Sequence, residues 1–161
     1  MSRRRVSFGL IAATFAAALA LTVVPLPDSL VWFRPYWVAM VLIYWCIESP
    51  EQVGMGTGFT MGLLLDLMTG SLAGQHALGL VIVAYIIGRI RFRMRFFPLW
   101  QQAAVVCGVL LNDRIIYTWI QGLAGYGVPD WRIAWAPLVV LFIWPWVFLI
   151  LDLTRQRFRT R

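Results

Sequence analysis

The feature that most constrains this chain is a succession of apolar runs separated by short polar turns. A helix needs about 20 apolar residues to cross the roughly 30 Å of hydrocarbon in a bilayer. Hydrophobic residues make up 61% of the chain and charged residues only 13%, against roughly 25% charged in a typical soluble domain. A soluble domain of this size cannot enclose so much apolar surface in its core. The sequence therefore predicts an integral membrane protein.

The apolar runs predict the fold class: an all-α membrane protein with six transmembrane helices in one bundle, forming a single domain over residues 1–161. The expected spans cover about 6–24, 35–47, 54–68, 72–90, 99–121 and 133–153. The turns between them are short, so we expect no soluble domain on either side of the membrane. The segment 28–33 is expected to lie flat at the interface.

The basic residues predict the orientation of this bundle. All 14 are arginine; three precede the first span, four lie from the end of the fourth span to the start of the fifth, and four follow the sixth. The positive-inside rule therefore predicts that both termini are cytoplasmic. We interpret the basic tail after Thr154 mainly as a topology signal. The net charge of +7 does not indicate nucleic-acid binding, because most arginines flank apolar runs and none lies on a basic helix with aromatic platforms for bases.

The third span carries small residues at intervals of four. Gly54, Gly58, Gly62 and Gly70 follow this spacing, and Asp66 completes the series. Residues four apart lie near one stripe of a helix, and such stripes let helix backbones approach closely in a membrane. Two interpretations remain open: ordinary packing within one subunit, or a docking face for a helix of another protein.

Polar residues inside apolar runs predict a second site. Asn112, Asp113 and Arg114 are consecutive in the fifth span, and Asp66 lies at a similar depth to Asp113, so these two carboxylates are expected to be able to meet. A carboxylate at such depth costs about 2.5–3.5 kcal/mol and should face the protein interior or a partner. This buried polar cluster has three interpretations: an Asp–Arg network that sets helix register, a pocket for a polar ligand or lipid headgroup, or an anchor for a partner's transmembrane helix.

Other candidate features are few. Pro145 in the sixth span predicts a kink, because it removes one backbone hydrogen bond; the kink is either a static bend or a hinge. Cys46, Cys107 and His76 have no metal-ligand spacing, and we expect His76 to be a polar residue at the membrane edge. We recognise no catalytic arrangement of residues. The sequence therefore predicts a protein that is not an enzyme and binds no metal or cofactor.

The order of several motifs resembles that of the MreD family of bacterial rod shape-determining proteins. The resemblance covers nearly the whole chain, and it is the ordered combination rather than any single motif that is specific. The motifs are Phe33-Arg34-Pro35-Tyr36-Trp37, Tyr44-Trp45, Gly56-Thr57-Gly58-Phe59-Thr60-Met61-Gly62, Leu65-Asp66-Leu67, Gly70-Ser71 with Gly74, Trp100-Gln101-Gln102-Ala103, Asp113, and Trp144-Pro145-Trp146.

This resemblance implies a non-enzymatic scaffold subunit of the rod complex, or elongasome, in the bacterial cytoplasmic (inner) membrane. It implies a bitopic MreC-type partner, and a wider complex with MreB, RodZ, RodA and a penicillin-binding transpeptidase that directs side-wall peptidoglycan synthesis. The family is also thought to be similar in fold to the substrate-binding subunits of energy-coupling-factor transporters. The alternative function is therefore a membrane substrate-binding component of a small-molecule or lipid transporter.

Overall fold

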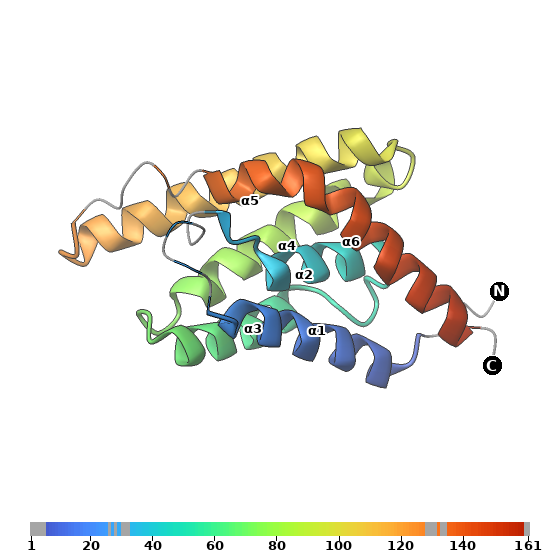
Figure 1. Cartoon of the computed structure of the whole chain (residues 1–161), viewed down its shortest axis with the longest axis horizontal. Helices are drawn as coiled ribbons and strands as arrows, with labels where there is room; N and C mark the ends of the chain where they lie inside the picture. The colour runs from blue at the N-terminus through green and yellow to red at the C-terminus, as the bar shows by residue number, and fades with distance from the viewer. Residues whose placement is uncertain are drawn as a thin grey trace.

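A computed structural model of the chain describes residues 6–25, 27, 29, 33–127, 132 and 135–159. Within these ranges the chain forms six α-helices and no β-strand (Figure 1): α1 (Phe8–Val23), α2 (Trp37–Glu48), α3 (Met55–Thr69), α4 (Gln75–Met94), α5 (Leu99–Leu123) and α6 (Trp135–Arg159). The basic start at Arg3, Arg4 and Arg5, most of the expected interface segment, and part of the loop before the sixth run lie outside the described residues.

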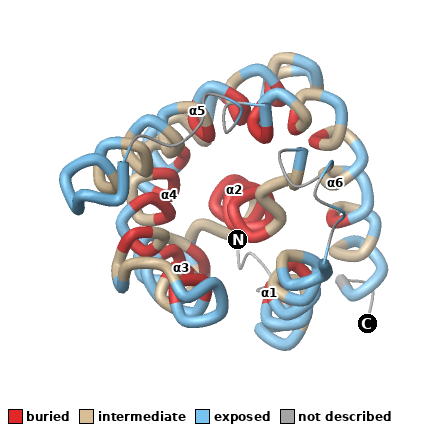
Figure 2. The backbone as a smooth tube through the Cα atoms, turned by 60° about the vertical axis from the view of Figure 1, so that its left-hand side comes forward, coloured by how far each residue is buried: buried red, intermediate tan, exposed pale blue. Residues whose placement is uncertain are grey.

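Helix α2 lies at the centre of the fold, with the other five helices around it (Figure 2). Residues 38–47 of α2 are all buried. A helix of 12 residues is about 18 Å long, shorter than the hydrocarbon layer of a bilayer. Its apolar sequence is therefore accounted for by contact with protein along its whole length.

The surrounding helices pack in neighbouring pairs. α3 packs extensively against α4, and α5 packs against α6, while α4 also contacts α2 and α5. α1 lies against α2 and has little contact with α6. Because α4 touches the central helix and both helices beside it, it joins the α3 side of the bundle to the α5–α6 side.

The start of α1 and the ends of α2 and α6 meet at one end of the bundle, on the right in Figure 1. The Gln52 side chain donates a hydrogen bond to the carbonyl of Val6 at 3.0 Å. Arg155 of α6 pairs with Glu48 of α2. We call this the terminal end of the molecule. The end of α1, the start of α2 and the connection between α3 and α4 lie at the other end.

The outward faces of the bundle carry large apolar side chains, including Trp119, Phe142 and Leu153, which are all strongly exposed. Extensive apolar surface of this kind is typical of contact with a membrane or another protein. By length and composition, α5 and the Trp135–Phe158 part of α6 can each cross a bilayer. α1 and α2 are apolar but shorter. The described helices thus include two that are clearly able to span a membrane.

Two helices extend beyond the apolar runs that predict them. α4 continues to Met94 and α6 to Arg159, both through arginine-rich sequence. Arginine is a favourable helix residue, so the change from apolar to basic sequence does not end either helix. α6 also continues through Pro145 and changes direction part-way along its length (Figure 1).

Candidate functional site

Asp66 holds the turn between α3 and α4. Its carboxylate accepts hydrogen bonds from the backbone N–H of Gly74 at 2.8 Å and of His76 at 3.0 Å, and from the Ser71 hydroxyl at 2.7 Å. The Nδ1 atom of His76 lies 2.8 Å from the same carboxylate. Asp66 is only 3% exposed. His76, which the sequence predicts to be a polar residue at the membrane edge, has a partly buried ring that is bound to Asp66.

The glycines of the third run divide into two kinds. A Cβ at Gly58 would lie 2.8 Å from the carbonyl oxygen of Leu80, and one at Gly62 would overlap the backbone of Ala77. Both glycines therefore pack against α4 of the same chain. Gly54 has open space around it, and Gly70 ends α3 in the left-handed conformation with φ +64°. At Gly58 and Gly62 the geometry favours packing within the subunit over docking of another protein.

The Asn112–Arg114 triplet does not form one buried cluster. Asn112 is exposed, which corrects its assignment to a buried group, whereas Asp113 and Arg114 are partly buried. Consecutive helical residues point about 100° apart, so the three side chains face different surroundings. Asp113 packs against α4 at Gly79. Within the described residues Asp113 and Arg114 form no ion pair, so an Asp–Arg network does not account for this triplet.

Arg114 lies over two tyrosine rings instead. Its guanidinium carbon is 3.9 Å from the ring centre of Tyr36 and 5.3 Å from that of Tyr117. Such cation–π contacts are typical for arginine, whose flat guanidinium is weakly hydrated. This contact joins α5 to the segment that leads into α2.

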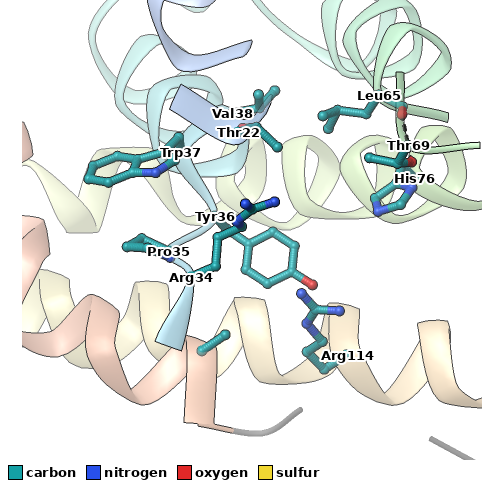
Figure 3. A pocket seen from close by; sticks show the side chains of 11 residues that line it. Thr22, Arg34, Pro35, Tyr36, Trp37, Val38, Leu65, Thr69, His76 and Arg114 are labelled. Carbon is teal, nitrogen blue, oxygen red and sulfur yellow. Dashed lines mark hydrogen bonds between the residues drawn. The ribbon is translucent and has the colours of Figure 1, made fainter. Parts of the chain in front are cut away.

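A cavity of about 260 Å³ opens beside this contact. We call it the arginine pocket. Figure 3 shows Tyr36 and two arginine side chains on one side of the cavity, and His76 on the other. Its wall is completed by apolar and hydroxyl-bearing side chains from several helices; the lining residues are Thr22, Arg34, Pro35, Tyr36, Trp37, Val38, Leu65, Thr69, His76, Arg114 and Ala136.

A second hollow is an apolar groove of about 480 Å³ between α1, α2 and α6. We call it the α1–α6 groove. Ala13, Ala17 and Ala18 of α1 form one side, and Val147 and Ile150 contribute to the α6 side. The small side chains of α1 let the backbone of another helix approach closely. The groove exists because α1 and α6 both pack on α2 but barely touch each other.

Charged side chains at the terminal end tie α6 to α2. Arg155 pairs with Glu48 and, at 2.7 Å, with Asp152. The Tyr44 hydroxyl donates to Asp152 at 3.3 Å. Arg95, from the end of α4, donates to the carbonyl of Ile47 at 2.6 Å. The first residue of the basic tail therefore has a packing role as well as any role in topology.

Sequence reasoning missed Arg34, Tyr36 and His76 as members of one site. Arg34 and Tyr36 stand in an aromatic and cationic segment that is equally typical of an interface anchor. His76 is separated from Asp66 by ten residues and a turn. Only the fold brings these side chains to one cavity. No group of three or more His, Cys, Asp or Glu side chains suited to a metal ion occurs in the part of the chain that the structure describes.

The fold and its sites define a class: an α-helical membrane protein in which a central apolar helix is enclosed by helices with apolar outer faces. The family model for MreD, rod shape-determining protein MreD, matches residues 2–154. This chain belongs to the MreD family, which implies a role in determining rod shape.

A similar curated protein supports the same assignment. The rod shape-determining protein MreD of Haemophilus influenzae is 30% identical to this chain over 143 residues, which cover 89% of this chain and 88% of that protein. No solved structure matches the chain.

Proposed function

We propose that this chain is a non-enzymatic scaffold subunit of the rod complex that binds the transmembrane helix of an MreC-type bitopic protein and so helps to direct side-wall peptidoglycan synthesis. Family membership supports the role in rod shape. The observation that carries the scaffold role is the α1–α6 groove, an elongated apolar surface left open between two helices.

The groove has the dimensions and chemistry of a helix-binding site. Its lining extends from Leu10 to Leu21 on α1, about 17 Å along the helix axis. It also extends from Val147 to Phe158 on α6, so both walls run for about three turns. The lining is almost wholly apolar, which suits a transmembrane helix and offers nothing to a charged solute. Association of helices in lipid depends on close packing of this kind.

We further propose that all six helices lie within the cytoplasmic membrane, with α2 shielded from lipid and the terminal end facing the cytoplasm. The placement of the arginine-rich ends of α4 and α6 near the terminal end supports this orientation, because positive residues accumulate on the cytoplasmic side. A fold similar to the substrate-binding subunits of energy-coupling-factor transporters remains part of the proposal.

The test is to fill the groove without changing the hydrophobicity of the surface. Ala17 lines the groove, whereas Ala16 is exposed on another face of the same helix. In cells depleted of the native protein, we expect Ala16→Phe to restore rod shape and Ala17→Phe to leave cells round. After extraction in mild detergent, an MreC-type protein should co-purify with the Ala16→Phe variant and be lost from Ala17→Phe.

Two results would count against this proposal. If both variants hold the MreC-type protein equally, the groove is not its binding site. If depleted cells stay rod-shaped but become starved of a vitamin or similar solute, the scaffold role fails and the transporter alternative replaces it.

A further inference from the structure

Two arginines line the arginine pocket, and the proposed scaffold role does not explain why they are there. Arg34, just ahead of α2, and Arg114, on α5, line the same cavity (Figure 3). Two guanidinium groups repel each other, and partial removal from water makes each of them costlier to keep charged. A folded protein normally offsets such a pair with carboxylates or with a bound anion.

Among the described residues, neither arginine side chain has a carboxylate partner. Arg34 donates to the carbonyl of Val24 at 2.6 Å, and the guanidinium of Arg114 lies over two tyrosine rings. The Nε atoms of both arginines are buried and have no hydrogen-bond partner in the described part of the chain. Buried donors of this kind are uncommon, and each calls for a physical reason.

Two aspartates beside lining residues, Asp66 next to His76 and Asp113 next to Arg114, make their contacts outside the cavity. Asp66 accepts hydrogen bonds from Ser71, Gly74 and His76 on the α3–α4 turn. Asp113 packs against Gly79 of α4, and neither aspartate lines the cavity. The positive charge of the pocket is therefore not balanced by either of these two aspartates.

We propose that the arginine pocket binds a phosphate-type oxyanion. The guanidinium group presents N–H donors in a planar fork that matches phosphate oxygens, and hydrogen bonds between two charged groups are among the strongest in proteins. The Tyr36 hydroxyl, which makes no hydrogen bond within the described residues, supplies a further donor. The proposed oxyanion lies between Arg34 and Arg114, with the His76 ring on the opposite wall of the pocket.

The size and surroundings of the cavity define the ligand class further. A volume of about 260 Å³ is large enough for a phosphate with a small substituent. Tyr36 and Trp37 stand at the pocket, and such aromatic residues mark the headgroup level of a bilayer. Guanidinium groups at that level can bind the phosphate of an anionic headgroup. The oxyanion is therefore either the headgroup of an anionic phospholipid or a soluble phosphate.

Binding to the purified protein in detergent tests this proposal and its two sources. The probes are dihexanoyl phosphatidylglycerol, dihexanoyl phosphatidylcholine and inorganic phosphate, each titrated while binding is followed by native mass spectrometry and by the shift in melting temperature. We expect phosphatidylglycerol to bind more tightly than phosphatidylcholine. Tighter binding of inorganic phosphate would assign the site to a soluble anion instead and would still support the oxyanion site.

Arginine variants locate the binding. Arg34→Gln and Arg114→Gln should each weaken binding of the preferred probe by at least about tenfold, the loss expected for one hydrogen bond between charged groups. Arg93 is exposed near the end of α4, so Arg93→Gln removes the same charge outside the pocket and should leave binding unchanged. Arg114→Lys keeps the charge without the planar fork and should bind more weakly than the wild type but better than Arg114→Gln.

Three outcomes would overturn the proposal. One is that the wild type binds no probe better than Arg114→Gln does. Another is that Arg93→Gln weakens binding as much as the two pocket variants, since that would indicate general attraction to a basic surface. The third applies if Arg114→Gln fails to fold. The proposal is then tested with Arg34→Gln and Arg114→Lys, and unchanged binding in both variants would contradict it.

Discussion

At the scale of single residues, the most consequential side chain is Asp66. Its spacing from Gly58 and Gly62 suggests membership of a packing stripe, but its carboxylate is an acceptor for two backbone N–H groups, a hydroxyl and an imidazole. A buried carboxylate satisfied in this way stabilises the turn that sets the start of α4. The cost of placing a charge in the bundle is thus offset by local hydrogen bonds.

Replacing Asp66 should therefore damage the fold in a graded manner. We expect Asp66→Ala to lower the free energy of unfolding by about 3 kcal/mol, because it leaves several buried donors without an acceptor. Asp66→Asn keeps one carbonyl oxygen and should lose less. Thermal unfolding in detergent measures both, with the exposed Glu51→Ala as control. Equal melting temperatures for Asp66→Ala and Glu51→Ala would show that these hydrogen bonds contribute little.

At the scale of helices, the pairing of α3 with α4 depends on which glycine faces the partner. The backbone of Ala77 occupies the place that a side chain at Gly62 would need, whereas Gly56 on the same helix has nothing within 4 Å. Helices in lipid gain little from excluding water and depend on van der Waals contact. A single methyl group at Gly62 therefore forces the two backbones apart.

This contrast predicts opposite outcomes for one chemical change. Gly62→Ala should separate α3 from α4 and lower accumulation of folded protein, while Gly56→Ala should be neutral or gain up to about 1 kcal/mol from its better helix propensity. Yields after membrane extraction and melting temperatures of the two variants provide the comparison. Should both variants behave like the wild type, the close approach of α3 to α4 would be ruled out.

At the scale of the whole molecule, the start of α1 and the arginine-rich ends of α4 and α6 gather at one end of the bundle (Figure 1). The Arg155–Glu48 pair and the Arg95–Ile47 hydrogen bond hold the ends of α6 and α4 to the end of α2. Arginines that support the proposed orientation in the membrane thus also fasten the helices together. Orientation and packing are therefore coupled through the same residues.

The proposed orientation predicts the outcome of labelling with a membrane-impermeant maleimide. Glu51 lies at the terminal end and Tyr126 beyond the far end of α5, and both are exposed. In right-side-out spheroplasts, Tyr126→Cys should be labelled and Glu51→Cys should not, until the membrane is broken. The native Cys46 and Cys107 are buried, so the wild type serves as the unlabelled control. Labelling of Glu51→Cys from outside would contradict the proposed topology.

The sequence by itself determined that the chain is helical and suited to a membrane. Those properties follow from composition and from local signals: the apolar runs predict helices, and Gly70, which the sequence places in the turn after the third run, ends α3 with φ +64°. The Pro145 signal was also local, and α6 bends while remaining continuous. Such features need no knowledge of distant parts of the chain.

Only the tertiary structure decided which apolar faces meet protein and which remain outside. α2 is enclosed by protein, whereas α6 is partly exposed. The two helices have similarly apolar sequences, because lipid tails and a protein core are equally apolar. The contacts of the polar side chains could not be predicted from the sequence either. Arg114 meets Tyr36, 78 positions away, rather than the adjacent Asp113, because neighbours in a helix point apart and the packing of α5 beside α2 selects the contact.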